Sequence, residues 1–147
     1  MKKIINRKAL FNYEFLEKQE AGILLTGAEV KSIKMGRINL AESFVKIRGG
    51  ELWLFNAHIA AYQPAADKDY EPTRTRKLLL HKKQIDQLAR RIDQKGLTIV
   101  PVSCYTANHK VKLGIALAKG KREYEKKEKI KKRDIQRDIE RELRGKN

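Results

Sequence analysis

Residues 45–55 have the sequence VKIRGGELWLF, and this stretch decides the class of fold. Two apolar residues, Val45 and Ile47, alternate with basic ones, which is the period of a strand that is buried on one face. The pair Gly49-Gly50 then favours a two-residue turn, because glycine adopts the positive φ angles that a tight hairpin requires. Residues 51–55 continue in extended form. The stretch therefore predicts an antiparallel β-hairpin.

Strand patterns also occur on both sides of this hairpin. The predicted strands cover residues 10–15, 23–25, 97–105 and 110–118, and polar residues 17–20 are expected to form a bend that joins the first two into a hairpin. Pro101 indicates an edge or a bulge in the third strand. In the last strand one face is apolar, formed by Val111, Leu113, Ile115 and Leu117, and the other carries Lys110, Lys112, Gly114, Ala116 and Ala118.

Helical spacing is clearest in residues 81–95, where apolar residues recur at 85, 88, 89 and 92. A shorter helix is predicted over residues 28–35, and glycines at 36 and 96 end the two helices. Residues 62–77 show no periodicity and are expected to form a long surface loop. Six strands with few βαβ signals predict a mainly β fold. We expect a six-stranded antiparallel barrel of the oligonucleotide-binding (OB)-like kind, with two or three short helices.

The charge of the chain indicates its partner. The 147 residues include 34 Lys and Arg against 18 Asp and Glu, a net charge of +16. Residues 121–147 hold 12 of the basic and 7 of the acidic residues, a net +5, so +11 remains in residues 1–120. Both parts favour a polyanion, and nucleic acid is the natural one. We therefore expect an RNA-binding barrel over residues 1–120 and a basic tail over residues 121–147.

The tail differs in character from the barrel. Its only apolar stripe at helical spacing is formed by Ile135, Ile139 and Leu143, which is too narrow to bury much surface alone. We expect the tail to be disordered in the free protein and to become helical on a partner. A solvated charged tail without a role is the alternative.

The sequence offers little for membranes, metals or catalysis. Apolar runs are only a few residues long and the N-terminus turns polar early, so a cytoplasmic protein is expected. Cys104 is the only cysteine and is expected to be a buried strand residue. His58, His81 and His109 lack metal-ligand spacing, and no glycine-rich phosphate loop occurs. We expect no cofactor, no metal and no enzymatic activity; a metal-independent ribonuclease is the enzymatic alternative.

Basic residues in two places are candidates for RNA contacts. Arg74, Arg76 and Lys77 end the predicted loop beside an apolar run, which suits phosphate binding; a solvated charge run is the alternative. A lysine row, which could also protect a strand edge, consists of Lys110, Lys112 and Lys119.

Two further residues have both a structural and an RNA-binding interpretation. Tyr13 alternates with Phe11 and Phe15, so it is either part of the core or a stacking surface for an unpaired base. Glu20 lies at the predicted bend, where a solvated turn residue is the simpler interpretation. A carboxylate can nevertheless accept hydrogen bonds from base amino groups.

Several stretches carry a family resemblance. They are Asn6-Arg7-Lys8-Ala9, Tyr13, Glu20-Ala21-Gly22-Ile23, Gly27-Ala28-Glu29-Val30-Lys31-Ser32, Pro72-Thr73-Arg74-Thr75-Arg76-Lys77-Leu78-Leu79-Leu80 and Lys119-Gly120-Lys121. In order and spacing they resemble the small protein B (SmpB) family, the tmRNA-binding proteins of bacterial trans-translation. The resemblance implies an OB-type barrel that holds the tRNA-like domain of tmRNA and delivers tmRNA to ribosomes stalled without a stop codon, with no catalytic step.

The resemblance also implies roles for particular residues. Residues matching Asn6, Tyr13, Glu20 and Leu79 are associated with tmRNA binding in the family, and the tail acts on the ribosome. With the charge pattern, the candidate RNA-binding residues are Asn6, Arg7, Lys8, Tyr13, Glu20, Lys31, Arg74, Arg76, Lys77, Leu79, Lys110, Lys112, Lys119 and Lys121. The candidate ribosome-contacting residues of the tail are Tyr124, Glu125, Lys126, Lys127, Ile135 and Ile139, with small-subunit rRNA as the main partner.

This chain departs from the family pattern in the tail. The family often has an Asp-Lys-Arg run where Glu125-Lys126-Lys127 stands, and often a histidine where Tyr124 stands. Charge is kept, but the bidentate geometry of arginine is lost. We expect a monomer. A structural ribosomal protein is the alternative function, because a basic barrel with a basic tail suits rRNA equally well.

Overall fold

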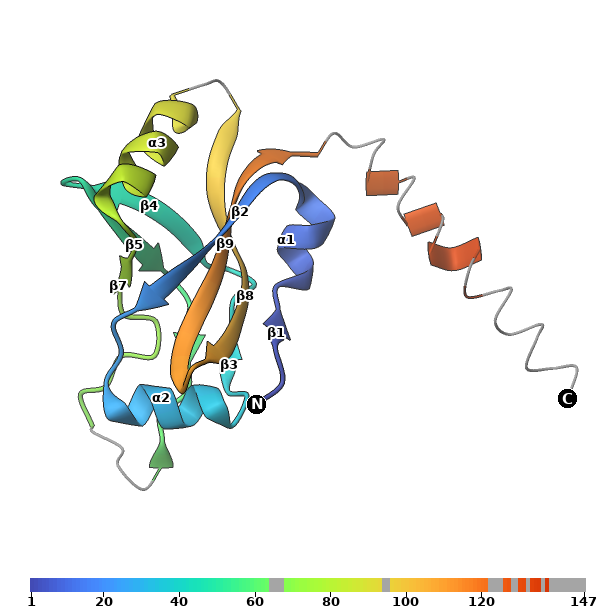
Figure 1. The fold of residues 1–147 in the computed structure, drawn as a ribbon. Helices are drawn as coiled ribbons and strands as arrows, with labels where there is room; N and C mark the ends of the chain where they lie inside the picture. Colours follow the sequence, from blue (N-terminus) through green and yellow to red (C-terminus); the bar gives the residue numbers. More distant parts are fainter. Residues whose placement is uncertain are drawn as a thin grey trace, which may run out of the picture.

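A computed structural model describes residues 1–63, 68–93 and 96–121, together with residues 126–127, 130–131, 133–135 and 137 of the tail. At its centre is a six-stranded antiparallel barrel (Figure 1). In order around the ring, its strands are β8 (Leu97–Ala107), β4 (Phe44–Arg48), β5 (Glu51–Phe55), β7 (Arg76–Leu79), β2 (Tyr13–Ile23) and β9 (Lys110–Gly120). Pairing of β9 with β8 closes the ring. The predicted OB-like barrel is confirmed.

Shorter elements surround this barrel. β1 (Ile4–Ile5) pairs with β8 outside the ring, and β3 (Ile38–Asn39) pairs with β6 (His58–Ile59) in a separate two-stranded sheet. The helices are α1 (Arg7–Asn12), α2 (Gly27–Lys34) and α3 (Lys82–Ile92). In Figure 1, α2 lies at the lower end of the barrel and α3 toward the upper end. Ile33 of α2 and Ile85 and Leu88 of α3 join the barrel core, so these two helices are anchored by burial of one apolar face.

The hairpin predicted from residues 45–55 is present. β4 and β5 pair in register from Phe44 with Phe55 to Arg48 with Glu51. Gly49 and Gly50 have φ angles of +60° and +74°, which only glycine adopts without strain in a two-residue turn. Local sequence therefore determined both the turn and the register of this pair.

β8 and β9 form a second, longer hairpin. The pairing shifts between Pro101 and Ser103, so the predicted bulge is confirmed. The apolar face of β9 lies in the core as predicted, and Cys104 is buried. Ala116 and Ala118 on the opposite face are buried as well, because Ala9 of α1 packs on them in a second apolar cluster. The lysine-bearing face of β9 is thus covered at one end.

Both predicted helices are confirmed and have clear ends. Thr26 caps α2 in a capping box with Glu29, and Gly36 follows it with φ +77°. His81 precedes α3, and Gly96 lies beyond it with φ +85°. The end of α2 matches the glycine stop predicted from the sequence, whereas α3 ends at Ile92, before the predicted end at residue 95.

The strands predicted at residues 10–15 and 23–25 are wrong in part. Residues 10–12 belong to α1, and β2 continues without a bend through residues 17–20. This polar stretch stays extended because β2 pairs with β9 from Tyr13 to Gly22, and backbone pairing does not depend on apolar side chains. The remaining ring strand, β7, comes from the end of the segment that was predicted as a loop.

The described residues of the tail are helical. Among them, Ile130 and Ile135 are exposed, with 38% and 51% of their surface accessible. Tyr124, Glu125 and Ile139 lie outside the described residues. The predicted disorder of the free tail stays a prediction.

Candidate RNA interface

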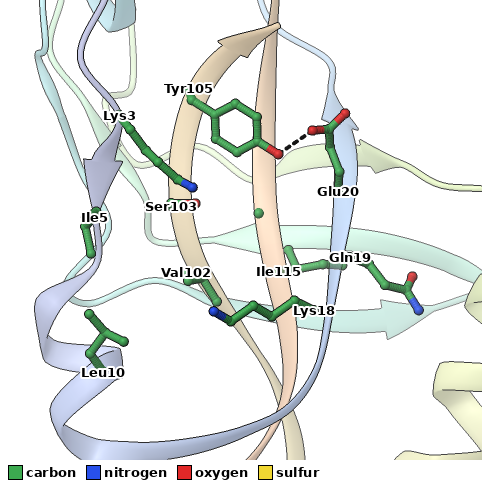
Figure 2. Close-up of a pocket in the computed structure, with 11 residues that line it drawn as sticks. Lys3, Ile5, Leu10, Lys18, Gln19, Glu20, Val102, Ser103, Tyr105 and Ile115 are labelled. Carbon is green, nitrogen blue, oxygen red and sulfur yellow. Dashed lines mark hydrogen bonds between the residues drawn. The ribbon is translucent and has the colours of Figure 1, made fainter.

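Side chains from β1, β2 and β8 meet on the outer face of the barrel (Figure 2). The hydroxyl of Tyr105 on β8 donates a hydrogen bond to the carboxylate of Glu20 on β2. The Nζ atom of Lys3 lies 5.1 Å from the centre of the Tyr105 ring. Lys18 lies two residues before Glu20 on β2 and lines the same recess. We call this group, Lys3, Lys18, Glu20 and Tyr105, the outer-face site.

The outer-face site surrounds a recess of about 340 Å³. Its apolar lining comes from Ile5, Leu10, Val102 and Ile115. Cations at the rim, an aromatic ring and a carboxylate with apolar neighbours form a surface that suits phosphates and an unpaired base together.

Gly114 on β9 lies between the strands that carry Tyr105 and Glu20. It is the cross-strand neighbour of Glu20 on one side and of Ser103 on the other. A Cβ atom at this position would lie 3.7 Å from the Tyr105 ring, an ordinary contact distance, but only 2.7 Å from Ser103 Oγ. The missing side chain therefore leaves room for the Ser103 hydroxyl beneath the site.

The environment of Tyr105 keeps its hydroxyl a donor. Burial, the hydrogen bond to Glu20 and the negative charge of that carboxylate raise the pKa of Tyr105 to about 12. The phenol is therefore protonated throughout the physiological range, and it holds the Glu20 carboxylate in one orientation.

Two more predicted residues extend the same face. Lys112 is the neighbour of Tyr105 on one side and of Gly22 on the other. Leu79 is paired with Gly22, and 46% of its surface is exposed. Glu20, Leu79 and Lys112 were thus predicted from separate segments and lie on three neighbouring strands.

Asn6 has a different place from the one predicted. Its side chain is buried, donates to the backbone oxygens of Leu40 (3.1 Å) and Pro101 (2.8 Å), and accepts from the Ala9 backbone N–H (3.2 Å) as the cap of α1. Both amide hydrogens are used within the protein, so a direct RNA contact by this side chain is contradicted. Tyr13 follows α1 and packs against the second apolar cluster, which favours the core interpretation.

The predicted phosphate contact by Arg76 is also contradicted. Its side chain is 0% exposed, and its guanidinium donates to Glu29 Oε2 at 2.7 Å and to the backbone oxygens of Ala57 at 2.7 Å and Pro72 at 3.0 Å. Arg74 bonds the same carboxylate. Arg74 and Arg76, which were predicted to bind phosphate, therefore both pair with the buried carboxylate of Glu29.

Glu29 is charged in this network of ion pairs. Burial alone would raise the pKa of its carboxyl, but hydrogen bonds from Arg74, the Thr26 backbone and Arg76, with the charge of Arg76, outweigh it, so the pKa lies below its usual range. Tyr70 donates to the same carboxylate at 3.3 Å. One acid thus joins α2 to the segment that leads into β7.

The other basic candidates have varied surroundings. Arg7, Lys110 and Lys119 are exposed. Several more are partly engaged within the protein: Lys8 pairs with Glu42, Lys31 lies over the Tyr62 ring, Lys77 pairs with Glu51, and Lys121 donates to the Leu10 backbone oxygen. Lys121 also bonds Asn12 through its backbone, so the described contacts attach it to the barrel rather than to the tail.

Lys3, Lys18 and Tyr105 were missed from the sequence. The signal for Tyr105 was its alternation with Cys104 along β8, since a buried Cys104 places its neighbours on the outer face. Lys3 could not be found in this way, because it lies just before β1, which is only two residues long.

The described residues also bear on metal binding and on membrane-spanning helices. Within them, His, Cys, Asp and Glu side chains form no group of three that could hold a metal ion. No helix among them is long and apolar enough to cross a membrane.

A closed antiparallel barrel whose outer face carries lysines beside an aromatic ring and a carboxylate is typical of a small OB-like barrel protein of the nucleic-acid-binding class. The chain belongs to the SmpB protein family, whose model matches residues 3–145. It is 55% identical to the SsrA-binding protein of Sulfurihydrogenibium sp. (strain YO3AOP1), over 96% of this chain and 93% of that one. It is 50% identical to the SsrA-binding protein of Carboxydothermus hydrogenoformans, over 99% of both chains.

A solved structure is similar as well. It is described as "tmRNA-SmpB: a journey to the center of the bacterial ribosome". The TM-score is 0.69 at 42% sequence identity, covering 82% of this chain and 85% of that one.

Proposed function

We propose that this protein binds the tRNA-like domain of tmRNA and delivers tmRNA to stalled ribosomes in trans-translation. The observation that carries the proposal is the convergence of Glu20, Leu79 and Lys112 on one face of the barrel. Three segments far apart in sequence supply them, and the family resemblance assigns RNA binding to two of the three.

Each group on this face has a defined task in the proposal. Lys3, Lys18 and Lys112 contact phosphates, which supply affinity without sequence information. Glu20 accepts from a base amino group, and Tyr105 is the positioning residue that orients the carboxylate. Asn6 acts indirectly, since it fixes the start of α1 beneath the site.

The tail has a separate task in the proposal. The segment after Lys121, with Tyr124, Glu125, Lys126, Lys127, Ile135 and Ile139, contacts small-subunit rRNA in the stalled ribosome. The protein works as a monomer in the cytoplasm and by binding alone, without a catalytic step. The exposed Ile135 is available for such a contact.

The first test compares two variants that remove one negative charge each. Glu20→Gln and Asp86→Asn change the net charge equally, and Asp86 lies exposed on α3. If the interface were only electrostatic, both changes would strengthen binding to the tRNA-like domain slightly, because the RNA is a polyanion. If Glu20 reads a base, Glu20→Gln weakens binding by roughly tenfold, because Tyr105 takes the one remaining acceptor oxygen and an N–H donor then faces the base amino group, so a base contact worth about 1–3 kcal/mol is lost. Fluorescence anisotropy at several salt concentrations measures both, and unchanged or tighter binding by Glu20→Gln contradicts the proposal.

The second test concerns the tail. Ile135→Pro should break the helix of the tail, so that the incomplete protein on a stalled ribosome is no longer tagged in a reconstituted trans-translation reaction. Binding to the tRNA-like domain should stay normal. Normal tagging by this variant, or an equal loss of RNA binding, would show that barrel and tail do not divide the work as proposed.

A further inference from the structure

A second aromatic surface lies on the outer side of the β4–β5 hairpin. The rings of Phe44 and Phe55 stack with their centres 5.2 Å apart and an angle of 9° between their planes. The Arg48 guanidinium carbon lies 4.8 Å from the centre of the Phe55 ring, and Lys46 Nζ lies 5.9 Å from that of Phe44. We call Phe44, Lys46, Arg48, Trp53 and Phe55 the hairpin face.

The register explains why these side chains share one surface. Phe44, Lys46 and Arg48 alternate along β4, and Phe55 and Trp53 are the cross-strand neighbours of the first two. The residues between them, Val45, Leu52 and Leu54, are buried in the barrel core. The hairpin face therefore points away from the core, and 36% of the surface of Phe44 is exposed.

Strand pairing alone does not account for this composition. Cross-strand aromatic pairs do stabilise sheets, and lysines do protect strand edges. However, β5 is paired along both sides, and β4 also pairs with β8 through Val45 and Ile99, so β4 is an open edge only beyond that pair. Within the described part of the chain, Lys46 and Arg48 form no ion pair, and Glu51 opposite Arg48 is paired with Lys77.

We propose that the hairpin face is a binding site for single-stranded RNA, in which unpaired bases stack on Phe44, Phe55 and the Arg48 guanidinium. Flat aromatic rings with unpaired cations beside them are the surface on which unpaired bases stack and backbone phosphates are neutralised. Lys46 and Arg48 supply the charge complementarity to phosphate. The site is separate from the outer-face site and does not depend on recognition of a tRNA-like domain.

The hairpin face continues into a recess that leads toward α1. This recess of about 260 Å³ is lined by Phe44 together with Lys8, Tyr13 and Thr98. In this recess Lys8 is paired with Glu42, so an RNA strand that extends from the hairpin face would meet the Tyr13 ring there and not a free cation.

Trp53 makes the proposal testable in the full-length protein, because it is the only tryptophan in the chain. It faces Lys46 across the hairpin, and its Nε1–H donates to the Arg48 backbone oxygen at 3.3 Å. A base that stacks on this surface should quench Trp53 fluorescence. We expect titration with a short oligouridine to quench it, and an abasic oligonucleotide of equal length and charge to bind at least about fivefold more weakly, since one base–aromatic stack contributes that much or more.

Variants separate stacking from charge and from folding defects. Phe55→Leu keeps an apolar side chain but removes the ring, and should lower oligouridine affinity about fivefold or more without changing abasic binding. Arg48→Lys keeps the charge but loses the planar stack, and should act in the same direction even if Phe55→Leu fails to fold. The matched control is Tyr62→Leu, which removes the ring of another lysine–aromatic pair, with Lys31 at 5.4 Å, and should change nothing.

Several results would overturn the inference. Equal binding of oligouridine and the abasic oligonucleotide would show that charge alone attracts RNA. Absence of Trp53 quenching would place any bound strand elsewhere. If Glu20→Gln abolished the quenching and Arg48→Lys left it unchanged, the RNA strand would be assigned to the outer-face site. Binding of the tRNA-like domain is measured separately, so failure here leaves the proposed function untouched.

Discussion

Replacing Glu29 with glutamine should destabilise the fold strongly, although the two side chains have nearly the same size and shape. Glu29 is 1% exposed and Arg76 is 0% exposed. Arg76 Nη2 lies 2.6 Å from Glu29 Oε2, and Arg76 Nε donates to the same oxygen at 2.7 Å. Arg74 and Tyr70 also donate to this carboxylate. Glutamine would leave the Arg76 guanidinium buried without a counter-charge.

The size of the effect follows from that burial. Removing one partner of a buried ion pair costs about 3–5 kcal/mol, because the remaining charge stays desolvated. Native domains are stable by about 5–15 kcal/mol, so the variant would lose a large fraction of its stability. The melting temperature should fall by roughly 10 °C or more.

Urea unfolding, followed by circular dichroism, measures the difference in unfolding free energy between Glu29→Gln and the unchanged protein. The matched control is Glu42→Gln, because the Lys8–Glu42 pair is exposed, with side chains 50% and 76% accessible, and should contribute at most about 1 kcal/mol. If Glu29→Gln unfolds at the same urea concentration as Glu42→Gln, the network does not stabilise the fold in the way described. Arg76→Ala should likewise lower stability, since it removes one of the two arginines that pair with the buried Glu29 carboxylate and the guanidinium donor to the Ala57 carbonyl.

Three further predictions concern pH and packing. Because the folded-state pKa of Glu29 lies below its ordinary value of 4.5, its contribution to stability is present above that pH and is lost as pH falls; urea midpoints of wild type and Glu29→Gln should therefore converge in acid. Absorbance titration of the tyrosines should reveal one pKa near 12 that is absent in Tyr105→Phe and moves down in Glu20→Gln; an unshifted value in Glu20→Gln would refute the Tyr105–Glu20 bond. Gly114→Ala should destabilise by about 1–3 kcal/mol through its contact with Ser103 Oγ, and adding Ser103→Ala should recover most of the loss in thermal melts; no recovery would assign the cost elsewhere.

Prediction from sequence succeeded where a short segment encodes its own conformation. Gly49 and Gly50 fixed the turn between β4 and β5, and the stop at Gly36 marked the end of α2. It failed in β2, whose polar residues 17–20 were predicted to bend. Nothing local distinguishes a polar turn from a polar strand, and the long pairing of β2 with β9 decided between them.

The candidate site shows the same division. Glu20, Leu79 and Lys112 were predicted as RNA-binding residues, and they lie on one face. Arg76 was predicted among them, yet it is buried, because β7 turns it toward Glu29 while Lys77 points outward. Tyr105 was missed, because its role in the site is a hydrogen bond to Glu20, which lies 85 residues away in the sequence.

The sequence by itself determined the β4–β5 hairpin, the helices α2 and α3, the basic charge and the family, because turn residues, apolar periodicity and charge are properties of neighbouring residues. Only the tertiary structure decided which charged groups face solvent and which face each other. Arg76 and Lys77 are adjacent and both basic, but successive residues of a strand point to opposite sides of the sheet. One therefore neutralises a buried carboxylate and the other reaches the surface, and only the pairing of β7 with β5 and β2 fixes which is which.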